Sequence, residues 1–105
     1  GLALSSRNVY LSSSERQAAP VLSRALQAGV AAIRAGERNG TRIRRHMLRV
    51  VETEPLATME YLAVCDPATL EPLSLLNRQA VLLGSIRIGT VRLLDNMLTA
   101  FRRKP

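Results

Sequence analysis

Apolar residues recur every three or four positions through two segments in the first half of the chain. The first stripe comprises Leu22, Ala25, Leu26, Gly29, Val30 and Ile33, and the second comprises Ile43, Met47, Val50 and Val51. This is the period of a helix with one buried face, so the pattern predicts two helices. The opposite side of the first helix carries Ser23, Arg24, Gln27 and Arg34.

Local signals place the ends of these helices. Ser12 and Glu15 have the spacing of a capping box, which predicts that a helix begins directly after Ser12. Pro20 lies too far along to be a first-turn proline, so it should interrupt that helix. Gly36 is a plausible stop, and Thr41 is predicted to cap the second main helix.

The period changes after Pro55, which should end the second main helix. Residues 59–65 are mostly apolar and predict a strand short enough to be buried on both faces. Two further strands are predicted at about 79–87 and 90–95, joined by a tight connection at Gly89 and paired antiparallel.

These elements predict an α+β fold with two main helices packed on a small three-stranded antiparallel sheet. We expect a single domain over residues 1–105. It divides into a loop (1–11), a helical part (12–54), the sheet (58–96) and a tail (97–105).

Composition is that of a soluble globular protein, with 47% hydrophobic and 22% charged residues. No apolar run is long enough to span a bilayer, and the first residues lack the layout of a secretory signal, so we expect a cytoplasmic protein without a membrane partner. The single cysteine, Cys65, is expected in the core. His46 has no neighbours at ligand spacing, so we expect no metal site.

The net charge of +7 raises the alternative of a small basic nucleic-acid-binding module. Against it, much of the charge is scattered and lies mainly on predicted polar helix faces, where solvated charge is common: Arg24, Arg34, Arg38, Arg42, Arg44, Arg45 and Arg49. The three aromatic residues, Tyr10, Tyr61 and Phe101, are not interleaved with a basic cluster. We therefore expect no nucleic-acid partner. An interaction domain with an exposed apolar edge is a third possibility.

The stretch Leu4-Ser5-Ser6-Arg7-Asn8 concentrates hydroxyls, backbone N–H groups and a guanidinium in one predicted loop. Arginine can donate two parallel charge-assisted bonds to phosphate oxygens, and serine hydroxyls can add further bonds. This set of hydrogen-bond donors suits a phosphate ligand, although an ordinary turn or helix cap has the same local pattern.

Three ordered motifs, however, resemble the pantothenate synthetase (pantoate-β-alanine ligase) family. The run from Gly1 to Ser12, GLALSSRNVYLS, is similar to the start of that family's carboxy-terminal domain. The segments 61–70 (YLAVCDPATL) and 87–96 (RIGTVRLLDN) are similar to its strand motifs. The resemblance covers nearly the whole chain.

The resemblance implies an ATP-dependent ligase. Pantoate attacks ATP to give pantoyl adenylate and pyrophosphate, and β-alanine then displaces AMP to give pantothenate, with magnesium accompanying the ATP. In this family Leu4, Ser5, Ser6 and Arg7 match a loop that closes on the nucleotide, so they would hold its phosphates. No catalytic residue and no metal ligand of the family maps onto this chain.

The family also carries an amino-terminal Rossmann-like domain, with an HxGH-type histidine pair and the pantoate-binding glutamines, and nothing in this chain matches it. The expected partner is therefore that domain of the same polypeptide, and the complete enzyme is expected to be a homodimer. We expect the isolated chain to be inactive. For Glu60, Asp66, Asp95 and Asn96 we prefer structural roles, with the last two satisfying a turn at a strand exit.

Overall fold

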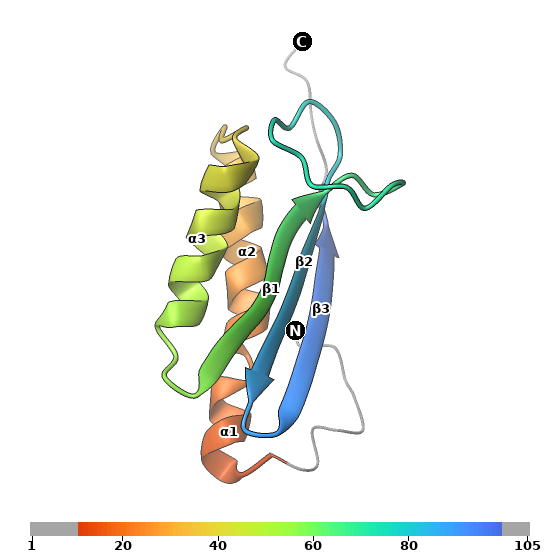
Figure 1. Ribbon diagram of the computed structural model, residues 1–105. Coiled ribbons are helices and arrows are strands. Elements are labelled where there is room, and N and C mark those ends of the chain that lie inside the picture. Colours follow the sequence, from red (N-terminus) through yellow and green to blue (C-terminus); the bar gives the residue numbers. More distant parts are fainter. Residues whose placement is uncertain (1–10, 100–105) are drawn as a thin grey trace.

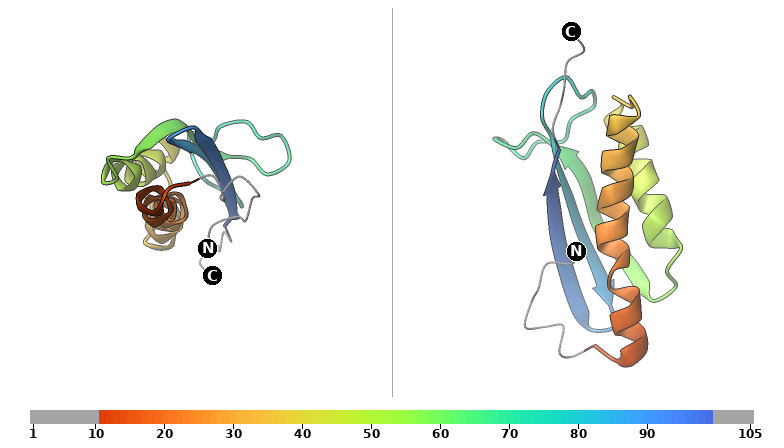
Figure 2. Two further views of the ribbon diagram at one scale, coloured as in Figure 1. Left: turned by 90° about the horizontal axis from the view of Figure 1, so that it is seen from below. Right: turned by 180° about the vertical axis from the view of Figure 1, so that it is seen from behind.

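The computed structural model, which describes residues 11–99, places three helices before three strands. The helices are α1 (Ser13–Ala18), α2 (Val21–Arg34) and α3 (Gly40–Glu52), and the strands are β1 (Ala57–Cys65), β2 (Val81–Ile88) and β3 (Val91–Leu98). The strands form one antiparallel sheet in the order β1-β2-β3. Helices α2 and α3 lie side by side on one face of it, which confirms the predicted α+β fold (Figures 1 and 2).

The predicted signals at the start of the helical part are confirmed. The Ser12 hydroxyl accepts from the backbone N–H of Glu15, while the Glu15 carboxylate accepts from the N–H of Ser12. Helix α1 ends at Ala18, and Pro20 is the N-cap of α2, so the proline separates two helices as predicted. Gly36 follows the end of α2 with a φ of +108°, a conformation that favours glycine.

Two details of the helical prediction are wrong. Asn39, and not Thr41, caps α3: its side-chain oxygen accepts from the backbone N–H of Arg42 at 3.0 Å, which places Thr41 inside the first turn. Ser23 is buried, although it was assigned to the polar face. Because α2 packs against both α3 and the sheet, its buried surface is wider than a single stripe.

The main core lies between the two long helices and the facing side of the sheet. Its largest fully buried side chains are Leu22, Leu26, Ile43, Met47, Leu82, Ile86 and Ile88. Each such side chain contributes about 1.5–3 kcal/mol by leaving water. Both predicted apolar stripes supply this core, which explains why the helix positions could be predicted.

The strands differ from prediction mainly in length. Strand β1 begins two residues before the predicted segment, and β3 continues three residues beyond Asp95. The last four residues of β1 are buried, as expected for a strand covered on both faces, whereas none of its first five residues is buried. Cys65 is fully buried, in a small second cluster with Ala63 and Val81. No helix among residues 11–99 is long and apolar enough to cross a membrane.

Gly89 and Thr90 form the two-residue connection between β2 and β3, since Ile88 pairs directly with Val91. Gly89 has a φ of +60° and Thr90 has no positive φ, the pattern of a type II′ hairpin turn. A side chain on Gly89 would collide with the carboxylate of Glu15. The start of α1 is therefore held against the hairpin end of the sheet.

We predict that Gly89→Ala destabilises the chain more than Gly36→Ala. Both positions have positive φ, where a residue with a Cβ costs about 1–2 kcal/mol. Only at Gly89 would the added methyl also meet Glu15, because nothing lies within 4 Å of a Cβ at Gly36. Urea unfolding of the two variants measures the difference, and equal losses would show that the contact with Glu15 is unimportant.

Candidate functional site

The predicted phosphate-binding residues Leu4, Ser5, Ser6 and Arg7 lie outside residues 11–99, so the structure places only the point at which their loop joins the fold. That point is anchored. Leu11 is buried in the main core, and the next residue, Ser12, is fixed by the capping box with Glu15. Since Glu15 lies against Gly89, the loop joins the domain beside the β2–β3 hairpin.

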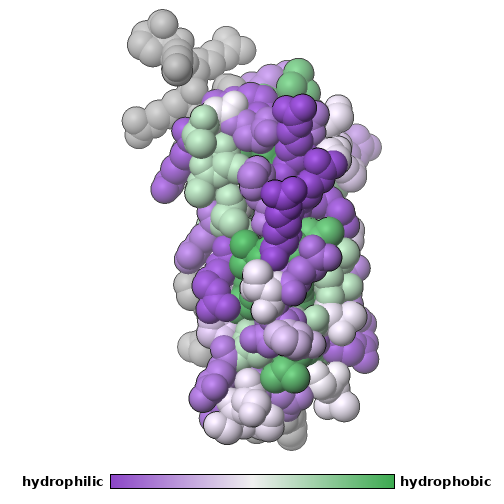
Figure 3. Space-filling view, turned by 90° about the vertical axis from the view of Figure 1, so that its left-hand side faces the viewer, coloured by the Kyte–Doolittle hydropathy of each residue, from purple (hydrophilic) through white to green (hydrophobic). Residues whose placement is uncertain are grey.

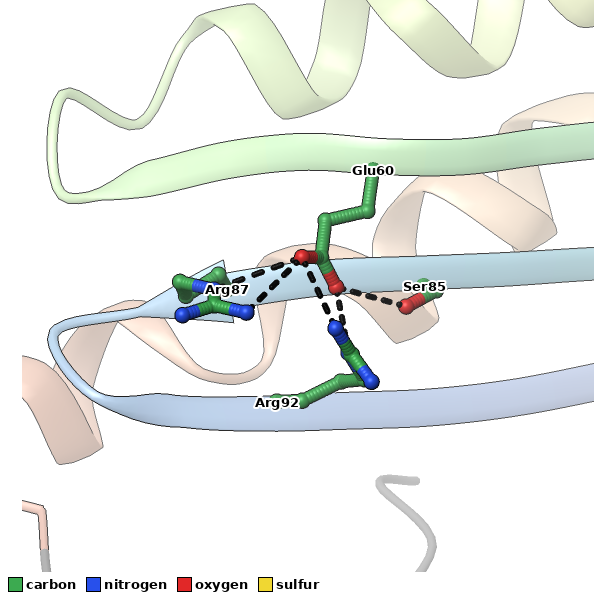
Figure 4. Close-up of polar contacts among 4 residues, drawn as sticks. All are labelled: Glu60, Ser85, Arg87 and Arg92. Atoms are coloured by element: carbon green, nitrogen blue, oxygen red, sulfur yellow. Dashed lines mark hydrogen bonds and ion pairs between the residues drawn. The ribbon is translucent and has the colours of Figure 1, made fainter.

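An ion network lies near the same hairpin, on the sheet face opposite the helices. The carboxylate of Glu60 on β1 binds Arg92 on β3 at 2.6 Å and Arg87 on β2 at 3.2 Å. Arg92 reaches both carboxylate oxygens, and the Ser85 hydroxyl donates to one of them at 3.2 Å (Figure 4). One side chain therefore cross-links all three strands.

The backbone explains why Glu60 can reach so far. The pairing of β1 with β2 shifts between Met59 and Tyr61, which leaves Glu60 as the extra, bulged residue. Arg87 and Arg92 are direct cross-strand partners, and two like charges facing each other destabilise a sheet. The Glu60 carboxylate neutralises that repulsion. Sequence reasoning missed this network because the bulge and the register, which bring the three residues together, have no sequence signal.

The network controls the ionisation of Glu60. Its pKa is lowered from the ordinary 4.5 to about 2, first by the hydrogen bond from Arg92, with further contributions from Ser85 and Arg87. The carboxylate is therefore charged throughout the neutral range. Half of each arginine side chain faces solvent, so Arg87 and Arg92 remain accessible at this surface.

The other polar candidates from the sequence are Asp66, Asp95 and Asn96. Asp66 has the structural role that was expected, because its carboxylate accepts from the backbone N–H groups of Ala68 and Thr69, which lowers its pKa. Asp95 and Asn96 were expected just after the third strand, and this position is wrong, because both residues lie inside β3. Asp95 accepts from the N–H of Asn96 through one oxygen, and its other oxygen is buried with no hydrogen-bond partner.

A hollow of about 300 Å³ lies between the start of α3, strand β1 and the chain at Pro72. The Arg44 guanidinium borders it and donates through Nε to the backbone carbonyl of Leu62 at 2.8 Å, which covers part of the exposed edge of β1. Tyr61 also borders it. The pKa of Tyr61 is raised, first by partial withdrawal from water and then by the Cys65 thiol, so its hydroxyl stays protonated at neutral pH.

Comparison with known proteins connects this fold to one enzyme family. A model of the family described as pantoate-beta-alanine ligase matches residues 1–98. The chain belongs to the pantoate-beta-alanine ligase family.

Individual members of the pantoate-beta-alanine ligase family agree with that match. The chain is 49% identical to the pantothenate synthetase of Roseiflexus castenholzii over 98 residues and 50% identical to that of Chloroflexus aggregans over 99 residues. The crystal structure of pantothenate synthetase from Thermus thermophilus superposes with a TM-score of 0.86 at 40% identity, over 92% of this chain. The matches cover only 35%, 36% and 35% of those proteins, so the chain spans about a third of their length.

For this member of the family we predict that Glu60→Gln lowers stability at neutral pH and that the loss disappears in acid. The folded-state pKa of about 2 lies below the ordinary 4.5, so the ionised network stabilises the fold above pH 4.5. That stabilisation is lost as the pH falls through about 2. Urea unfolding of both proteins across this range measures it.

Glu71→Gln is the matched control, since the Glu71 carboxylate makes none of these contacts among residues 11–99. A Glu60→Gln deficit that is the same at every pH would contradict the assigned ionic role.

Proposed function

We propose that this chain is the carboxy-terminal domain of a pantothenate synthetase, an ATP-dependent ligase that joins pantoate to β-alanine. Pantoate and ATP give pantoyl adenylate and pyrophosphate, and β-alanine then displaces AMP. The observation that carries this proposal is the family match over residues 1–98, which includes the Ser5-Ser6-Arg7 loop. Because the chain spans about a third of its relatives, the complete reaction requires the rest of the polypeptide.

Within this reaction Leu4, Ser5, Ser6 and Arg7 form the loop that closes over the nucleotide. Forming the adenylate builds negative charge on the departing pyrophosphate. Donors fixed against that charge stabilise the transition state more than the ground state. The anchoring of Leu11 and Ser12 supports this role, because a loop that must position donors needs a fixed base.

The nucleotide is a substrate, and magnesium accompanies it. Among residues 11–99 no group of three histidine, cysteine or carboxylate side chains could hold a metal ion. We propose that the ATP-bound magnesium contacts the phosphates and the remainder of the enzyme. The complete enzyme would be a cytoplasmic homodimer whose subunit contacts lie chiefly outside this domain.

The partner of this domain is the amino-terminal, Rossmann-like part of the same polypeptide. The sheet face opposite the helices, here called the open face, is suited to contact that part. Leu94 and Leu98 are 63% and 57% exposed there, and Tyr61 is 47% exposed. Tyr61, Ser85 and Leu94 form one cross-strand row, which adjoins the Glu60 network. The missing two thirds of the relatives' length supplies a chain large enough to cover this face.

An active-site test requires the complete enzyme, obtained by substituting this chain for the matching third of the Roseiflexus castenholzii synthetase. We predict that Arg7→Ala in this chimera slows adenylate formation by roughly 100-fold, because one charge-stabilising donor is lost. Pantoate binding should be nearly unchanged. Stopped-flow measurement of adenylate formation and calorimetry with pantoate give the two values.

Arg16→Ala, which removes an exposed arginine from α1, is the matched control and should leave both values unchanged. Equal losses of adenylate formation and pantoate binding in Arg7→Ala would contradict a phosphate role. The chain alone should release no AMP in the presence of all substrates, and release by the chain alone would refute its expected inactivity.

A second variant tests whether the open face of the sheet contacts the amino-terminal part. In the same chimera Leu94→Glu should lower the melting temperature and the rate of pantothenate formation, because it places a charge on a face that we assign to the domain interface, where the charge would lose its water. Leu70→Glu, at a similarly exposed leucine in the segment between β1 and β2, should change neither. A Leu94→Glu chimera as stable and active as the parent would remove the open face from the interface.

A further inference from the structure

The exposed side of α3 carries a compact basic cluster. Arg42, Arg45, His46 and Arg49 are all exposed and, with Glu37, line a polar hollow of about 140 Å³. The spacing of three, four and seven residues places these side chains on one helix face. Figure 3 shows this side of the molecule, where strongly hydrophilic side chains gather over the first part of α3.

Like Arg16, Arg24 and Arg34, these arginines have no carboxylate partner among residues 11–99, but Arg42, Arg45 and Arg49 line one hollow. Arg78, Arg87 and Arg92 each pair with a carboxylate. Within residues 11–99, no carboxylate lies within ion-pair distance of Arg42, Arg45 or Arg49.

Glu37, the acid that borders the hollow, is already engaged. One of its carboxylate oxygens accepts from the backbone N–H groups of Arg38 and Asn39, at 3.1 and 3.3 Å. This contact holds the carboxylate at the turn that leads into α3. Three arginines against this one carboxylate leave the hollow with a net positive charge.

Such an arrangement opposes folding of the helix. Like charges three and four residues apart repel, and the positive end of the helix dipole, near Arg42, adds to the repulsion. A bound anion would remove both penalties. The guanidinium groups supply the parallel donors that phosphate oxygens accept.

We propose that this hollow binds a small, multiply charged phosphate ligand at a site separate from the Ser5-Ser6-Arg7 loop. The lining side chains surround one hollow, and Arg42 and Arg49 are only about 10 Å apart along the helix axis. A groove lined by alanines of α2 shares Glu37 and His46 with the hollow and offers space for an uncharged part of the ligand. Nucleic acid fits less well, because the aromatic residue within residues 11–99, Tyr61, lies on β1 and not on this helix.

Inorganic pyrophosphate is the probe, because it has no uncharged part and so reports on the charged hollow and not on the alanine-lined groove. Calorimetric titration of the chain at physiological ionic strength should give saturable binding. The triple variant Arg42→Gln, Arg45→Gln, Arg49→Gln should weaken it at least 10-fold. The matched control Arg16→Gln, Arg24→Gln, Arg34→Gln changes the net charge equally at exposed positions on α1 and α2, and should stay within twofold of the parent.

In an Arg7→Ala background the α3 triple variant should still weaken pyrophosphate binding at least 10-fold, which separates this site from the proposed catalytic loop. The inference would be overturned by equal weakening in the two triple variants, which would indicate diffuse charge, or by the absence of any effect of the α3 triple variant in the Arg7→Ala background. Tighter binding of a single-stranded oligonucleotide than of pyrophosphate, through the same three arginines, would replace it with a nucleic-acid surface. Far-ultraviolet circular dichroism confirms that each variant is folded.

Discussion

The structure depends on burying one face of a three-stranded sheet beneath two helices. A sheet with one apolar face must bury that face against another layer of secondary structure. Helix α2, with Leu22 and Leu26, covers the inward side of β2 and β3, and α3, with Ile43 and Met47, covers β1. Everything else on the domain is arranged around this one-sided core, including the exposed opposite face and the anchored first turn.

Most of the fold could be predicted because its determinants are local. The apolar stripes identify two helices, and Pro20 and Gly36 act through their own backbone geometry. Errors arose where tertiary contacts decide. Ser23 is buried because α2 packs against both α3 and the sheet. Strand β3 extends beyond its predicted end because its pairing with β2 continues to Leu98.

The candidate functional surfaces were harder to predict from the sequence than the fold. The proposed phosphate role of Ser5, Ser6 and Arg7 rests on a resemblance to a family, since Ser-Ser-Arg alone also suits a turn. The network of Glu60, Arg87 and Arg92 depends on a bulge and on a hairpin register. The basic hollow depends on which side of α3 stays exposed once Ile43 and Met47 are buried.

These features divide the domain into surfaces with different tasks. The helix-facing side of the sheet maintains the fold, and the opposite side, where Tyr61, Leu94 and Leu98 are exposed beside the ion network, is the face that we propose meets the rest of the polypeptide. The chain before Leu11 leaves from the hairpin end, near that network. A rigid domain of this kind can bring a short loop to a nucleotide that another domain holds.

The most direct test of the central claim is a crystal structure of the complete synthetase containing this chain, with bound ATP or a non-hydrolysable analogue. The account predicts that the Arg7 guanidinium and the hydroxyls of Ser5 and Ser6 lie within hydrogen-bonding distance of the phosphate oxygens. A structure in which the nucleotide is fully ordered and this segment lies away from the phosphates would contradict it.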